Sequence, residues 1–109
     1  MVYADTGDWQ RAATLFSALA ASRTDEVGAR AALQRGLAME GLGRTAEAID
    51  ALVRLGAQFT GFDDIAAEAL WNAWRIAVAR GDDAHAASLD HLLRTRYPRS
   101  AWAELPTER

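Results

Sequence analysis

The sequence predicts an all-α fold, built as a right-handed superhelical array of antiparallel helix pairs with about five helices. One spacing occurs three times, first as Gly7, Ala12, Phe16 and Leu19, then as Gly43, Ala48, Leu52 and Leu55, and then as Gly81, Ala86, Asp90 and Leu93. The glycines are 36 residues apart (7 to 43) and then 38 (43 to 81), a period typical of helical repeats. No segment alternates apolar and polar residues as a strand would.

Residues that favour helix ends divide the chain into its elements. We expect five helices, at about residues 9–20, 24–40, 45–57, 65–80 and 84–97. Asp8, Thr24 and Thr45 are the expected N-caps of the first three, because Asp and Thr side chains accept hydrogen bonds from the free amides of a first turn. The segment Gly41-Leu42-Gly43 ends the second helix, and Gly81-Asp82-Asp83 turns the chain after the fourth.

In the second half of the chain, a loop and two prolines mark the expected helix ends. Residues 58–62 form the longest expected loop, and Pro98 stops the fifth helix because a residue before proline avoids the helical conformation. Ser100 then reads as the N-cap of a further short helix that Pro106 closes.

The whole chain is expected to be one domain made of repeat units. These are a partial unit at 1–22, repeats at 24–59 and 63–98, and the start of a further helix or a tail at 100–109. Only six residues precede Gly7, whereas a helix-length segment precedes Gly43 and Gly81. We therefore expect a fragment of a longer array, in which the chain begins inside a repeat.

Composition indicates a packed globular protein and excludes several classes of partner. Half of the 109 residues are hydrophobic, a quarter are charged, and the net charge is -3. A negative chain lacks the basic surface that nucleic-acid binding requires, so no nucleic-acid partner is expected. Cysteine is absent, which removes disulfides and thiolate metal sites. No apolar run approaches the ~20 residues of a membrane-spanning helix.

The segment from Gly7 to Phe16 resembles the second-helix motif of tetratricopeptide repeats: glycine, an acidic residue, an aromatic residue, two variable residues, alanine, and a large apolar residue four positions later. The second unit resembles a whole repeat, because Gly36 stands where that family keeps a small residue between its paired helices. Pro98 stands where the family's closing proline falls. The resemblance covers nearly the whole chain and implies a scaffold that binds proteins.

The third unit departs from this pattern at two positions. Trp74 replaces the small residue that Gly36 supplies, and Asp90 replaces the large apolar residue of Phe16 and Leu52. Either Trp74 fills a wider gap while Leu89, Leu92 and Leu93 provide the burial, or Trp74 contacts a ligand or partner.

The first helix of each pair is expected to bury one stripe and show the other to a concave groove. The expected core stripe is Ala32, Gly36 and Met39, with Leu70, Trp74 and Ala77 in the next repeat. The opposite stripe is the candidate partner-binding surface: Arg30, Leu33, Gln34, Leu37, Glu40, Glu68, Trp71, Asn72, Arg75 and Val78.

The residue types of this surface suit a peptide or protein partner. Trp and Arg are enriched at interface hot spots. Asn72 and Arg75 could hold a peptide's backbone or carboxylate while Trp71 and Leu37 cover its apolar side chains. Two alternatives stay open. Either a neighbouring repeat or chain missing from this fragment covers Leu33, Leu37, Trp71 and Val78, or these exposed apolar residues promote self-association.

The residues offer no catalytic arrangement, so we expect no enzyme activity, cofactor or metal in this domain. His85 and His91 are six residues apart and fall on different faces of one helix. Asp63, Asp64, Asp82 and Asp83 lie at two helix starts, where capping and interaction with the helix dipole explain them without a metal. A cluster of Arg94, Arg96 and Arg99 suits a helix C-terminus, and an anionic partner there is the alternative.

The segment Tyr97-Pro98-Arg99-Ser100 is similar to the repeat ending of bacterial envelope proteins, including the periplasmic coordinator of the Tol-Pal system, outer-membrane assembly lipoproteins and the arms of soluble lytic transglycosylases. The resemblance favours a non-catalytic interaction scaffold in a bacterial envelope complex, in the periplasm. The alternatives are the helical arm of a larger enzyme and a cytoplasmic adaptor.

Overall fold

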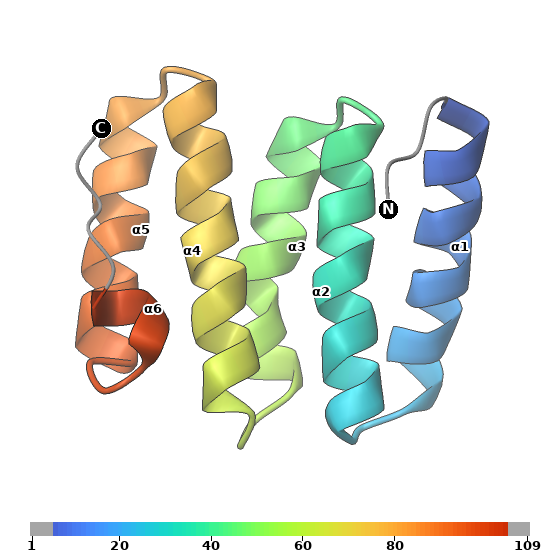
Figure 1. The fold of residues 1–109 in the computed structure, drawn as a ribbon, viewed down its shortest axis with the longest axis horizontal. Coiled ribbons are helices and arrows are strands. Elements are labelled where there is room, and N and C mark those ends of the chain that lie inside the picture. Colours follow the sequence, from blue (N-terminus) through green and yellow to red (C-terminus); the bar gives the residue numbers. More distant parts are fainter. Residues whose placement is uncertain (1–5, 105–109) are drawn as a thin grey trace.

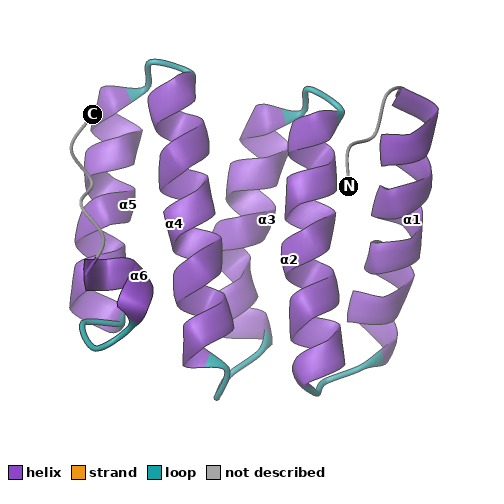
Figure 2. Ribbon diagram, viewed as in Figure 1, coloured by secondary structure: helices purple, strands orange, loops and turns teal. Residues whose placement is uncertain are grey.

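The computed structural model describes residues 6–104, and these form six helices joined by short turns (Figures 1 and 2). The helices are α1 (Thr6–Ser22), α2 (Glu26–Gly41), α3 (Thr45–Gln58), α4 (Asp63–Ala79), α5 (Asp83–Arg96) and the short α6 (Ala101–Glu104). The all-α prediction is confirmed, and each expected helix is present.

Each helix packs against the next one along the chain, from α1 at one end to α5 at the other (Figure 1). We call α2 and α4 first helices, because each leads a pair that α3 or α5 completes. By the repeat register, α1 corresponds to a second helix and α6 to the start of a first helix. The first helices also contact one another, α2 with α4 and α4 with α6.

Two identical turns end the first helices, as the glycine spacing predicts. Gly43 and Gly81 have φ angles of 82° and 75°, the left-handed region that only glycine adopts at little cost. The amide of Gly43 donates to the Glu40 carbonyl and the next amide to that of Met39, both at 2.9 Å, and the Gly81 turn repeats this pattern. These bonds satisfy carbonyls that a helix end otherwise leaves free.

The predicted N-caps are partly wrong. The helix α1 begins at Thr6, so Asp8 lies inside it. Asp25 and not Thr24 caps α2, because its carboxylate accepts the Gly28 amide at 3.2 Å. Thr45 is the first residue of α3, which has no side-chain cap. Ser100 does cap α6, accepting the Ala103 amide at 3.1 Å.

The main core is one cluster of buried residues that runs through α1 to α6, and it contains repeated positions. Ala48, Leu52 and Leu55 of α3 are each 0% exposed. A Cβ atom added to Gly36 would come within 2.6 Å of the Leu52 side chain, so glycine at this position lets α2 and α3 approach closely. The expected core stripe is confirmed for Ala32, Gly36, Leu70 and Ala77, whereas Met39 and Trp74 are only partly buried against the core.

The third unit reaches the same packing with different residues. Asp90 of α5 is partly buried, and its carboxylate accepts a hydrogen bond from the Arg94 Nε at 2.9 Å. Leu89 and Leu93 are buried and Leu92 is partly buried. The leucines therefore provide the burial at this position, as one of the two interpretations expected.

The described helices include none that is long and apolar enough to cross a bilayer. Two expectations concern residues outside the described range: the first residues of the partial unit, 1–5, and the stop at Pro106.

The cap of α2 predicts a pH dependence of stability. Hydrogen bonds from Arg23 and from the Gly28 amide lower the pKa of Asp25 from 3.8 to about 2. A lowered pKa in the folded state stabilises the fold above the unfolded value, and this contribution is lost as the pH falls from about 4 to about 2. Wild type should therefore lose more stability over this range than Asp25→Asn, which keeps a capping oxygen without the charge. Urea denaturation at a series of pH values measures the difference, and parallel curves would contradict the assignment.

Candidate functional site

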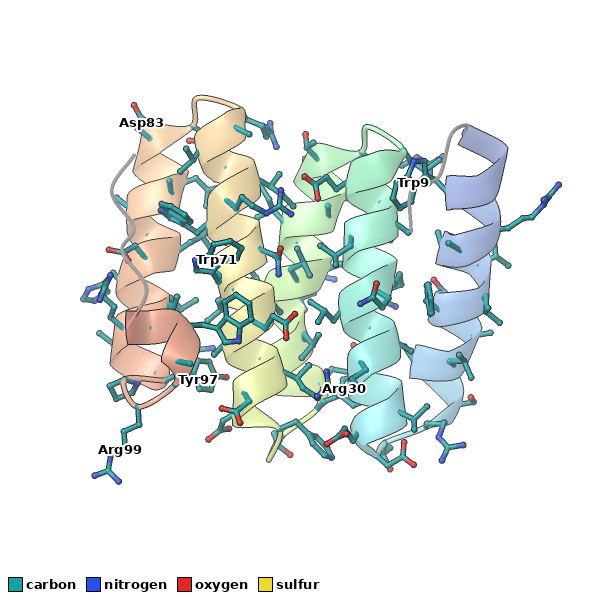
Figure 3. The ribbon with its side chains drawn as sticks, in the orientation of Figure 1. Trp9, Arg30, Trp71, Asp83, Tyr97 and Arg99 are labelled. Atoms are coloured by element: carbon teal, nitrogen blue, oxygen red, sulfur yellow. The ribbon has the colours of Figure 1, made fainter. Side chains whose placement is uncertain are left out.

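The ten predicted binding residues lie along the two neighbouring first helices, Arg30 to Glu40 on α2 and Glu68 to Val78 on α4. We call this set the α2–α4 surface. The two helices contact each other directly, so the structure brings the two halves of the predicted stripe together. Arg30 lies near the lower end in the view of Figure 3, and Trp71 near the middle of α4.

The side chains of the α2–α4 surface differ strongly in exposure. Arg30 and Gln34 are exposed, and Leu37, Glu40, Glu68, Trp71, Arg75 and Val78 are partly buried. Leu33 is 1% exposed and Asn72 is 8% exposed. The structure therefore places Leu33 in the core, where a partner cannot reach it, and Leu37, Trp71 and Val78 pack against that core.

A polar network joins the two first helices. The Arg75 guanidinium donates to both Glu40 carboxylate oxygens, at 2.8 and 2.9 Å. Its Nε and Nη2 atoms also donate to the Asn72 Oδ1 atom, at 3.3 and 3.1 Å. The Asn72 amide in turn donates to the Glu68 backbone carbonyl at 2.9 Å. Each polar group is thus fixed by another on the adjacent turn or helix.

This network changes the role expected of Arg75. Hydrogen bonding to Glu40 is the main reason that the pKa of Arg75 rises above its ordinary value, so the side chain stays charged. A bidentate arginine–carboxylate pair is among the stronger polar contacts in proteins. A peptide carboxylate would compete with Glu40 for the guanidinium, and the Glu40–Arg75 pair carries no net charge on the surface.

Trp71 is covered by a residue that the sequence interpretation did not assign to the site. The Trp71 and Trp102 ring centroids are 5.2 Å apart, with planes tilted by 47°, and the Trp71 and Trp74 ring centroids are 6.2 Å apart. The Trp71 indole N–H is buried and donates to no acceptor among the described residues. The short helix α6 therefore places Trp102 against Trp71.

Once Leu33 is known to be buried, the repeat register indicates that Trp71 is covered as well. Leu33 and Trp71 are 38 residues apart, the same offset that separates the glycines of the last two turns. Residues at equivalent positions share an environment in a repeat array, so burial of Leu33 implies a cover for Trp71. Only the three-dimensional structure shows that Trp102 supplies it.

The exposed end of the surface lies around Arg30. Its guanidinium is 3.5 Å from Glu26, and both side chains are more than half exposed, so this ion pair is weak. A hollow of about 200 Å³ opens beside it, lined mainly by Glu26, Phe62, Asp63, Asp64 and Ile65. Arg30 and Gln34 are thus the polar side chains of the surface most accessible to a partner.

Some of the remaining candidate residues have structural contacts and others are exposed. Asp63 and Asp64 lie in the first turn of α4 and do not cap it, because α4 has no side-chain cap. The Asp82 carboxylate accepts the His85 amide and caps α5, and His91 is exposed. Arg94 donates to the Ala103 carbonyl at 2.8 Å and so holds α6, while Arg96 and Arg99 are exposed. Within residues 6–104, no group of three or more acidic or histidine side chains is arranged to hold a metal ion.

Comparison of the chain with protein-family models, with curated proteins and with solved structures gave no match. The function is therefore inferred from the sequence and from the contacts of the chain's own residues.

Proposed function

We propose that this chain is a non-catalytic scaffold of the tetratricopeptide type, which binds a peptide or protein segment along the α2–α4 surface. The resemblance of the repeated glycine and alanine positions to that family supports the proposal, as does the close approach of paired helices at Gly36. The resemblance of the Tyr97-Pro98 segment extends the proposal to a partner in a bacterial envelope complex.

The main support for the proposal is the hydrogen-bonded ion pair between the two first helices, α2 and α4. The Glu40–Arg75 pair joins α2 to α4 in a fixed position, and Asn72 fixes the guanidinium in turn. A surface held rigid before binding loses little conformational entropy when a partner docks. Exposed Arg30 and Gln34 would then donate to the partner's backbone, and the partly exposed side of Leu37 would take an apolar side chain.

A site-specific crosslinking experiment tests the position of the partner. A photoreactive phenylalanine analogue replaces Gln34, which is exposed on α2, or Ala87, which is exposed on α5 away from the surface. We expect one defined adduct in cells of the source organism from position 34 and none from position 87. Mass spectrometry of the adduct identifies the partner.

Binding of the purified partner then tests the residues. Arg30→Glu and Gln34→Ala change exposed side chains and should leave the fold intact, and hot-spot residues cost more than about 1 kcal/mol when truncated. We expect weaker binding by Arg30→Glu and Gln34→Ala and unchanged binding by Arg54→Glu on the exposed side of α3. Equal affinities of all three variants would refute the assignment of the α2–α4 surface.

A further inference from the structure

A hollow of about 410 Å³ is lined by residues of α2 and α3, two helices that pack side by side (Figure 1). The lining consists of Arg35 and Met39 from α2, and of Glu47, Asp50, Ala51, Arg54 and Gln58 from α3. None of these residues belongs to the α2–α4 surface, so the hollow is a separate feature of the second unit.

Arg35 brings an unsatisfied hydrogen-bond donor to this hollow. Its side chain is partly buried, and its Nε atom is buried and donates to no acceptor in the described part of the chain. No ion pair to another described residue is found for its guanidinium. A buried polar group without a partner costs free energy, and a charged one costs more. The Arg35 side chain is therefore more stable with an acceptor bound to it than without one.

In the third unit, apolar side chains fill the equivalent place. The residue 38 positions after Arg35 is Ala73 of α4, 0% exposed, and the residue 38 positions after Ala51 is Leu89 of α5, 3% exposed. The third unit thus buries a small residue of its first helix and a large one of its second. The second unit reverses the sizes, and its arginine and alanine line one hollow. Packing between paired helices therefore does not by itself require an arginine at this position.

The other charged groups of the hollow leave the charge of Arg35 uncompensated. Asp50 pairs with Arg54, whose Nη2 atom is 3.3 Å from the carboxylate. Glu47 is exposed in the first turn of α3, where the positive end of the helix dipole favours a carboxylate. The Arg35 guanidinium remains, in one hollow with the apolar side chain of Met39. The complementary ligand carries one carboxylate on a short apolar stem.

We propose that the hollow between α2 and α3 binds the carboxylate of a glutamate side chain in a peptide partner, with Arg35 as its anchor. A carboxylate accepts hydrogen bonds from the Nε and one Nη atom of an arginine in the bidentate geometry that this side chain favours. The methylene groups of the glutamate pack against Met39. The site does not depend on the function proposed for the α2–α4 surface.

The Nε–H resonance of Arg35 in the ¹⁵N-labelled chain measures the proposed hydrogen bond directly, and its absence from the spectrum of Arg35→Lys identifies it. The chain is titrated with the peptide Ala-Glu-Ala, blocked at both ends, and in parallel with Ala-Gln-Ala, sodium acetate and sodium phosphate. We expect a saturable shift with Ala-Glu-Ala and none with Ala-Gln-Ala, which has the same shape without the charge. Acetate should bind roughly tenfold more weakly than Ala-Glu-Ala, because it lacks the methylene groups that cover Met39.

Three variants test the anchor, with the amide resonances of Met39 and Ala51 as the readout. Arg35→Met removes the charge and keeps a long apolar stem, so it should abolish binding without lowering the Tm. Arg35→Lys keeps the charge without the Nε–H donor and should bind roughly tenfold more weakly than wild type. Arg80→Met removes an exposed arginine at the end of α4 and should bind like wild type.

Three results would overturn the proposal. The first is an Arg35 Nε–H resonance that Ala-Glu-Ala leaves unchanged in the wild-type chain. The second is an affinity of Arg35→Met for the peptide equal to that of wild type. The third is acetate or phosphate binding as tightly as Ala-Glu-Ala, because a free small anion and not a peptide side chain is then the ligand.

Discussion

Replacing Ala48 by leucine is expected to lower the free energy of unfolding by about 1–3 kcal/mol, because extra methylene groups in a packed core force neighbouring side chains and backbone to shift. Ala48 is 0% exposed, and its repeat equivalents Ala12 and Ala86 are 7% and 4% exposed. Small size at this position lets α3 approach its neighbours. Urea denaturation followed by circular dichroism measures the change.

Ala46→Leu is the matched control for this substitution. Ala46 belongs to the same helix, two residues earlier, and is exposed. Leucine and alanine are both good helix formers, so the control should change stability by less than about 0.5 kcal/mol. Equal destabilisation of the two variants would show that helix propensity, and not packing, determines the result.

Leu89→Ala is expected to lower the free energy of unfolding by about 2–5 kcal/mol, the usual cost of a cavity at a buried leucine. Leu15→Ala makes the same chemical change at the equivalent position of α1, where the side chain is 57% exposed, and should cost less than about 0.5 kcal/mol. Because residue type, repeat position and helix class are the same, the difference reports the presence of a covering helix. Thermal and urea denaturation of both variants provide the measurement.

The contrary result would be a similar loss of stability in Leu15→Ala and Leu89→Ala. It would mean that Leu15 is covered in solution, either by a second copy or by residues outside the described range. Measuring both variants over a range of protein concentrations separates these cases, because only association makes the loss depend on concentration.

Local patterns predicted the helices well, because helix ends in this chain are fixed by nearby residues. Gly43 and Gly81 adopt the left-handed conformation that a helix-ending glycine predicts. The caps were harder to assign, since Thr24 and Asp25 both have suitable oxygens and the backbone reaches only one of them. Asp25 also pairs with Arg23, whose Nε lies 3.0 Å from its carboxylate, and this second contact favours it over Thr24.

The candidate surface was predicted less completely, because its environment depends on helices distant in the sequence. Helical periodicity places Leu33 and Arg30 on one stripe, but it does not reveal that the first is buried and the second exposed. In the same way, Arg75 reads as a cation available to a ligand until Glu40, 35 residues earlier, is seen to bind it. Contacts between neighbouring repeats therefore decide which residues of the stripe remain accessible.

The tryptophan cluster gives the last short helix its own optical signal. Trp71 and Trp74 belong to α4 and Trp102 to α6, and the planes of the neighbouring indole rings are tilted by 44° and 47°. Indole rings held in a fixed, asymmetric environment give a near-ultraviolet circular dichroism signal, which is lost when tertiary packing is lost. Release of α6 would remove the contribution of the Trp102–Trp71 contact to this signal while the far-ultraviolet helical signal of α1 to α5 hardly changed. Docking of a four-residue helix can thus be followed without a label.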